Sequence, residues 1–132
     1  MLDEFTERLR NTVRTIPDFP IEGIQFRDIT PVLSDGKLLS EITDRFVKEM
    51  NDRNWQPDAV VGPESRGFIF GALLAAKLGI AFIPVRKPGK LPHAIIREEY
   101  SLEYGTNVIE ILKDAIMPDQ KDFPYVIRVV SE

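Results

Sequence analysis

Two short apolar segments on either side of a helical segment constrain the fold more than any other feature of the sequence. Residues 58–62, DAVVG, and 80–86, IAFIPVR, have the length and the β-branched side chains typical of buried strands. Between them, residues 67–78 are apolar and rich in small residues, and Gly79 ends this expected helix. Parallel neighbouring strands need a crossover connection, so this order predicts an α/β fold with a parallel sheet flanked by helices.

Further helices and strands are expected on both sides of this unit. Two amphipathic helices are predicted, because apolar side chains recur at intervals of three and four. The first is expected to end before Pro17 and the second near residue 50. The apolar positions are Leu2, Phe5, Leu9 and Val13 in the first, and Leu38, Leu39, Ile42, Phe46 and Met50 in the second. Residues 15–33 hold three prolines and one glycine among large apolar residues, which indicates an irregular but packed connection. Residues 95–112 read as an antiparallel hairpin, and residues 126–130 as a last strand.

Composition narrows the class of protein. With 132 residues, 43% of them hydrophobic, the chain is expected to form a single domain. The net charge of −4 provides no general attraction for nucleic acid or an anionic membrane, so any anion site must be local. The absence of cysteine excludes disulfides, thiolate metal sites and cysteine nucleophiles, and a single histidine argues against a histidine metal cluster. Without a signal peptide or an apolar run of membrane-spanning length, we expect a soluble, intracellular protein.

The segment GPESRGF, residues 62–68, joins the first predicted strand to the helix that follows it. Ligands of open α/β sheets bind beyond the carboxyl ends of strands, at such turns. Glycines permit close approach of the backbone, the helix N-terminus offers N–H groups, and Arg66 adds a guanidinium, a combination that favours phosphate or pyrophosphate. The alternative is a solvated loop in which Arg66 pairs with Glu64.

A basic cluster follows the second predicted strand. Arg86, Lys87 and Lys90 surround a Pro-Gly turn in an otherwise acidic chain. Strand ends of one parallel sheet lie on the same edge, so this cluster and the first turn are expected to face one anion; the alternative is a solubilising surface cluster. Residues 87–93 resemble a mobile lid, and we interpret His93 as exposed.

The predicted hairpin closes at YSLEYG, residues 100–105, which places Glu103 beside Tyr100 and Tyr104. A carboxyl group near aromatic rings can have a raised pKa and can transfer a proton. The alternative is a solvated acid at a bend.

Four segments, in order and spacing, resemble the adenine phosphoribosyltransferases of the type I phosphoribosyltransferase class. They are IPDFP with GIQFRDITPVL, VVGPESRGFIFG, PVRKPGKLP, and EEYSLEYGT with EILKDAI, within residues 10–121. The resemblance implies transfer of ribose 5-phosphate from phosphoribosyl pyrophosphate (PRPP) to adenine with Mg²⁺, which yields AMP and pyrophosphate in purine salvage. It also implies a cytoplasmic homodimer, with Mg²⁺ carried by PRPP or pyrophosphate rather than by a dedicated protein site.

The resemblance also assigns residues on the base side. Gln25, Phe26 and Arg27 match the segment that grips adenine by stacking on the phenylalanine and by main-chain hydrogen bonds. Glu103 matches the carboxyl group that handles the proton of the base, and Tyr104 lies in the same flap. The alternative for Phe26 is a core side chain.

On the phosphate side, the turn Glu64-Ser65-Arg66, continued by the amide of Gly67, matches the pyrophosphate loop, which often contains a non-proline cis peptide. Lys87 and Lys90 match cations that contact pyrophosphate, while Arg86 lies near the subunit contact of the family. The expected fold is therefore a base-binding hood segment with an N-terminal helix, residues 1–33, and an incomplete α/β core, residues 34–132, with a flap at about 87–112.

The last residues depart from the family pattern. After residue 121 the family continues with an apolar strand, two aspartates and a threonine-glycine loop that wraps the 5-phosphate, whereas this sequence reads DFPYVIRVVSE. Arg128 fits a strand covered on both faces poorly. We therefore expect a partial, C-terminally truncated fold with weak or no turnover. Two alternatives to the enzyme stay open, a module that binds nucleotide or pyrophosphate without reaction and a dimerisation partner of a full-length subunit.

Overall fold

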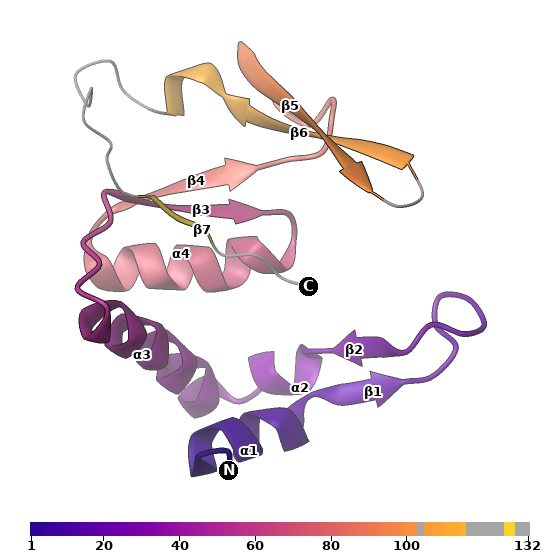
Figure 1. Cartoon of the computed structure of the whole chain (residues 1–132), viewed down its shortest axis with the longest axis vertical. Coiled ribbons are helices and arrows are strands. Elements are labelled where there is room, and N and C mark those ends of the chain that lie inside the picture. Colours follow the sequence, from indigo (N-terminus) through magenta and orange to yellow (C-terminus); the bar gives the residue numbers. More distant parts are fainter. Residues whose placement is uncertain (103–104, 116–125, 129–132) are drawn as a thin grey trace. The chain divides into compact units, whose positions relative to one another are not determined.

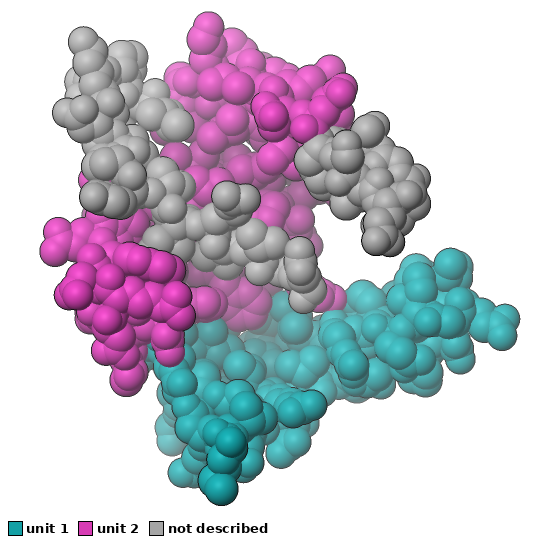
Figure 2. All heavy atoms as spheres, viewed as in Figure 1, with its two compact units in different colours: residues 1–45 teal, residues 46–132 magenta. Residues whose placement is uncertain are grey.

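The computed structural model describes residues 1–102, 105–115 and 126–128 (Figure 1). The chain divides into two units, residues 1–45 and residues 46–132, which Figure 2 colours teal and magenta. We describe each unit by itself. A single domain with an internal division near residue 33 stays a prediction. In the described part of the chain, no helix has both the length and the apolar character needed to cross a membrane.

The first unit is built from short elements around the start of a long helix. They are α1 (Glu4–Thr12), β1 (Arg14–Ile16), β2 (Phe26–Asp28), α2 (Thr30–Leu33) and the first part of α3 (Gly36–Asp52). Val32, Leu38 and Ile42 are its buried apolar side chains. The predicted first and second helices are confirmed in α1 and α3.

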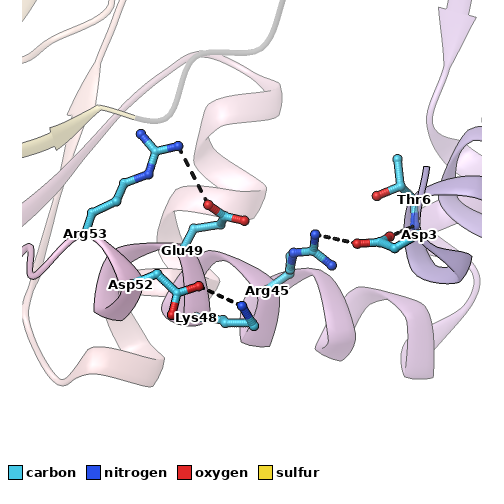
Figure 3. A network of polar contacts seen from close by, with 7 residues as sticks. All are labelled: Asp3, Thr6, Arg45, Lys48, Glu49, Asp52 and Arg53. Atoms are coloured by element: carbon cyan, nitrogen blue, oxygen red, sulfur yellow. Dashed lines mark hydrogen bonds and ion pairs between the residues drawn. The ribbon is translucent and has the colours of Figure 1, made fainter. Parts of the chain in front are cut away.

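Asp3 fixes the start of α1 and joins this helix to α3. Its carboxylate accepts a hydrogen bond from Thr6 N at 2.8 Å, as an N-cap residue does, and a second from Arg45 of α3 at 2.6 Å. Figure 3 shows this contact next to the ion pairs Lys48–Asp52 and Glu49–Arg53 along α3. The polar side of α3 is therefore covered by paired charges.

The prediction of an irregular connection over residues 15–33 is wrong at both ends of that segment. β1 and β2 form an antiparallel pair in which Thr15 is opposite Arg27 and Ile16 is opposite Phe26. A four-residue helix, α2, follows, with Pro31 in its first turn. Strands of three residues are too short to show an alternating pattern in the sequence, which is why this pair was not predicted.

The second unit contains the predicted parallel sheet. Its elements are β3 (Ala59–Pro63), α4 (Arg66–Leu78), β4 (Ala81–Val85), β5 (Ile95–Leu102), β6 (Gly105–Leu112), the 3₁₀ turn η1 (Lys113–Ala115) and β7 (Val126–Arg128). The sheet has the order β4-β3-β7 with parallel neighbours, and α4 lies along one of its faces (Figure 1). The antiparallel hairpin β5–β6 confirms the prediction for residues 95–112. β7 confirms a last strand over residues 126–128, and residues 129–130 lie outside the described residues.

The core of this unit joins α3, the sheet and α4. Its buried members are Met50, Val60, Leu74 and Ala75. Two glycines allow α4 to approach the sheet closely. A Cβ at Gly62 would lie 2.4 Å from the carbonyl oxygen of Gly67, and one at Gly71 would lie 2.6 Å from the ring of Phe82. Gly62, which lies in β3, is thus needed for strand–helix packing, which the sequence did not show.

Candidate functional site: a sheet edge with a turn and a lysine loop

The turn at residues 64–67 and the loop at residues 86–90, which we call the lysine loop, lie together at one edge of the sheet. β3 and β4 run parallel with Pro63 opposite Val85, so the next residues of both strands are neighbours. Glu64 N donates to the carbonyl oxygen of Val85 at 3.0 Å and extends the strand pairing into the turn. The prediction that the two basic segments share a sheet edge is confirmed.

The Glu64 carboxylate holds the turn against the lysine loop. Its Oε1 accepts a hydrogen bond from Lys87 N at 2.7 Å and lies 3.3 Å from Arg86 Nε. The hydrogen bond from Lys87 N, and after it the charge of Arg86, lowers the pKa of Glu64 below its ordinary value. The carboxylate is therefore occupied within the protein. Direct contact between Glu64 and a pyrophosphate stays a prediction.

The rest of the turn leads into the N-terminus of α4. The peptide bond between Glu64 and Ser65 is cis, as the resemblance implies. Ser65 is the N-cap residue of α4, and its carbonyl oxygen accepts from Phe68 N at 3.1 Å. Ser65 is exposed, Arg66 is half-buried and Gly67 is buried. This arrangement sets the first N–H groups of a 13-residue helix beside the lysine loop, where they can bind an anion.

The lysine loop presents two exposed cations on a turn that is itself fixed. Lys87 and Lys90 are exposed, and Pro88 and Gly89 form the bend between them. Gly89 has φ +80°, a value that favours glycine, so the bend requires this residue. Gly89 N donates to Oε1 of Glu110 at 2.8 Å. Two backbone hydrogen bonds, from Lys87 N and from Gly89 N, therefore restrain the first half of residues 87–93, the segment for which a mobile lid is predicted.

Arg86 is directed toward the protein. Its backbone N and O form hydrogen bonds with the backbone of Glu110, at 2.9 and 2.8 Å, which joins the end of β4 to strand β6. Its guanidinium lies near Glu64 and 5.7 Å from the ring centre of Phe68. These contacts explain why Arg86 is half-buried, whereas Lys87 and Lys90 are exposed. A role of Arg86 in substrate binding stays a prediction.

Glu110 is the site residue that the sequence analysis missed. Only 2% of it is exposed, and its Oε2 lies 3.2 Å from Arg97 Nε across the β5–β6 hairpin. A signal was present, because Glu110 is the one acid within the apolar run VIEIL of residues 108–112. An acid at an inward position of a strand usually has a partner, since an unpaired buried charge is costly.

The predicted base-binding segment lies in the first unit. Gln25 and Arg27 are exposed, and Phe26 is half-buried in β2. The ring of Phe26 meets that of Phe19 edge to face, with ring centres 5.1 Å apart, and Arg27 donates to the hydroxyl of Thr15 on β1. The ring of Phe26 is therefore packed on one side against Phe19, but it is not enclosed in the core, as the alternative of a core side chain would require.

The remaining residues singled out in the sequence are Glu103, Tyr104 and His93. Glu103 and Tyr104 lie outside the described residues. His93 is exposed, in agreement with its prediction. The described residues contain no group of three or more histidine, cysteine or acidic side chains that could hold a metal ion.

Comparison with known proteins identifies clear relatives. No protein-family model matches the chain. The adenine phosphoribosyltransferase of Chloroflexus aurantiacus is 56% identical over 110 residues, which are 83% of this chain and 62% of that protein. Curated relatives with similar matches are covered over 62–65% of their length, so the chain spans less than two thirds of them.

Solved structures agree with the sequence comparison. The crystal structure of adenine phosphoribosyltransferase from Thermoanaerobacter pseudethanolicus has a TM-score of 0.83 and 46% identity, with 95% of this chain and 69% of that chain covered. The enzyme of Saccharomyces cerevisiae, in complex with adenine and an imino-altritol bisphosphate, has a TM-score of 0.79 and 38% identity, with 87% of this chain and 66% of that chain covered.

Proposed function

The chain belongs to the adenine phosphoribosyltransferase family, and from this premise we propose that it serves purine salvage by forming AMP and pyrophosphate from adenine and PRPP. In this proposal, the sheet edge of the second unit binds the diphosphate of PRPP with its Mg²⁺. The segment Gln25–Arg27 binds the base. The relative from Saccharomyces cerevisiae, whose structure contains adenine, supports this choice of base.

The observation that carries the proposal is the hydrogen bond from Lys87 N to Glu64 Oε1, at 2.7 Å. It joins the turn before α4 to the lysine loop, so Arg66 at the start of α4 and the two lysines follow the ends of two neighbouring strands in an otherwise acidic chain. A diphosphate is the ligand that this set of donors favours, because it has many acceptor oxygens and high negative charge.

The chemistry needs groups of this kind. When the bond between the anomeric carbon and the pyrophosphate oxygen breaks, negative charge grows on the leaving group, and fixed cations and N–H donors stabilise it. Mg²⁺, when it arrives with the diphosphate, neutralises part of the same charge. A nitrogen of adenine forms the new bond and gives up its proton, which Glu103 is proposed to receive, while Tyr104 belongs to the flap that keeps water out.

Calorimetric titration with Mg²⁺–pyrophosphate tests the phosphate side directly. We expect Lys87→Ala to weaken binding by about 2 kcal/mol, or roughly 30-fold, as for the loss of one charge-assisted hydrogen bond. Lys77→Ala is the matched control, because Lys77 is an exposed lysine in the last turn of α4, at the opposite end of the helix from the turn. Equal loss in both variants would reduce the site to a general charge effect and contradict the proposal.

Conversion of radiolabelled adenine to AMP, with Mg²⁺ and PRPP, tests the reaction. Residues 1–132 contain no match to the 5-phosphate loop of the family, so we propose weak turnover by this chain compared with a full-length relative. Ordinary turnover would disprove that part. Pyrophosphate binding without turnover would instead favour a binding module. The homodimer and the cytoplasmic location implied by the family stay predictions, and size measurement at several concentrations addresses the first.

A further inference from the structure

Two glutamate side chains accept hydrogen bonds from the backbone of the lysine loop. Glu64 Oε1 accepts from Lys87 N at 2.7 Å, and Glu110 Oε1 accepts from Gly89 N at 2.8 Å. These amides are two positions apart in the same short loop, while the carboxylates come from two elements, the turn after β3 and strand β6. The loop is therefore fixed at two points, one at Lys87 and the other next to Lys90.

Each carboxylate is also paired with an arginine. Arg86 Nε lies 3.3 Å from Glu64, and Arg97 Nε lies 3.2 Å from Glu110. The Glu110 side chain is only 2% exposed, so the amide of Gly89 and the guanidinium of Arg97 supply the partners that its burial requires. One oxygen of Glu110 thus joins the loop to β6, and the other contacts Arg97 of β5, so the side chain that holds the loop is itself held by the neighbouring strand.

We propose that Glu110, together with Glu64, is a positioning residue that holds the lysine loop in the conformation that binds diphosphate. This inference rests on the proposed function of the sheet edge. Lysine side chains are long and flexible, and a mobile backbone beneath them would add to the conformational freedom that is lost on binding. Carboxylates that restrain the backbone lower this cost without touching the ligand.

Simple electrostatics predicts the opposite sign for the loss of these carboxylates. A negative charge near an anion site repels the ligand, so its removal should strengthen binding. A positioning role predicts weaker binding, because the loop is released. The sign of the change in affinity therefore separates the two interpretations, and hydrogen exchange of the loop amides reports the release itself.

The experiment uses the full chain with Glu110→Ala, Mg²⁺–pyrophosphate as the calorimetric probe and amide exchange measured by NMR. We expect exchange of the Gly89 amide to rise about tenfold and affinity for Mg²⁺–pyrophosphate to fall about tenfold, as for the loss of a hydrogen bond to a charged group. Glu98→Ala is the matched control, because it removes an exposed carboxylate from β5 of the same hairpin. Its affinity should stay equal or rise slightly.

Two further variants keep the test decisive if Glu110→Ala does not fold. Glu110→Gln retains an acceptor for Gly89 N, so the exchange rate and the affinity should return most of the way to the wild-type values. Glu64→Ala removes a less buried side chain and should speed exchange of the Lys87 amide.

Unchanged exchange of these two amides in the variants, or faster exchange with equal or tighter pyrophosphate binding, would overturn the positioning role. If the wild-type chain does not bind Mg²⁺–pyrophosphate, the proposed function fails. The exchange rates of the Lys87 and Gly89 amides then still decide whether the two carboxylates hold the loop.

Discussion

The two predicted binding segments are held in the structure by very different contacts. The sheet edge around Glu64 and the lysine loop continues two paired parallel strands and contacts the nearly inaccessible Glu110. The base-binding segment lies on the hairpin β1–β2, in which no residue is fully buried. That hairpin is joined by exposed polar pairs, among them Arg14 with Asp28, whose Arg14 side chain is 59% exposed.

The two segments are therefore held in place by interactions of different strength. Exposed ion pairs contribute little, about 0 to 1 kcal/mol, whereas buried packing and satisfied buried hydrogen bonds are costly to disrupt. The sheet edge with the lysine loop is therefore expected to keep its conformation without ligand, and the predicted base-binding segment to open locally at lower free energy. Substitutions at Gly62 and at Phe26 each test one side of this contrast, and the acid stability of the first unit tests the exposed pairs.

The largest effect is expected from Gly62→Ala. A Cβ at this position would lie 2.4 Å from the backbone oxygen of Gly67, which cannot yield as a flexible side chain would. We expect the free energy of unfolding to fall by about 3 kcal/mol, measured by denaturant titration. Gly36→Ala is the control, because a Cβ there meets no atom within 4 Å. An equal, small effect of both changes would show that the strand and the helix are not held as tightly as the contact implies.

A smaller effect, confined to one ligand, is expected from Phe26→Ala. Loss of a stacking ring should weaken adenine binding by about 2 kcal/mol, or roughly 30-fold, while Mg²⁺–pyrophosphate binding stays unchanged. Calorimetry with each ligand measures both. Phe46→Ala, at an exposed phenylalanine of α3, serves as the control. Retained adenine affinity in Phe26→Ala would place the base elsewhere and leave Phe26 as a packing residue for Phe19.

The smallest effect concerns acid stability of the first unit. Hydrogen bonds from Thr6, then from Arg45, lower the pKa of Asp3 from 3.8 to about 2, and those from Thr30, then from Arg14, lower the pKa of Asp28 from 3.8 to about 2. Both carboxylates bind protons more readily in the unfolded chain. They therefore stabilise the folded state above about pH 4, and this contribution is lost as the pH falls toward 2.

Denaturant unfolding at a series of acidic pH values measures this loss, which should be small because both groups are solvent-exposed. The double variant Asp3→Asn with Asp28→Asn should show a flatter pH profile, since asparagine still accepts the capping hydrogen bond but does not titrate in this range. Identical slopes for wild type and variant would contradict the assignment of the two carboxyl groups.

The sequence was sufficient wherever a pattern was long or a motif was linked to others. The apolar period of α3, the small-residue run of α4 and the two β-branched segments predicted helices and a parallel sheet, because these patterns follow directly from which faces must be buried. The order of the two strands further predicted that the turn at 64–67 and the lysine loop share an edge. It did not reveal the hairpin β1–β2, whose strands of three residues carry no pattern.

Residue types and their order thus determined the fold class and the family, and they predicted the segments proposed to bind the ligands. Tertiary structure alone decided how individual groups are used. It directed Arg86 toward Glu64, made Gly62 a packing residue, and gave Glu110 its place between Gly89 and Arg97. The physical reason is that hydrogen-bond partners far apart in sequence are set by strand register and burial, which appear only once the chain has folded.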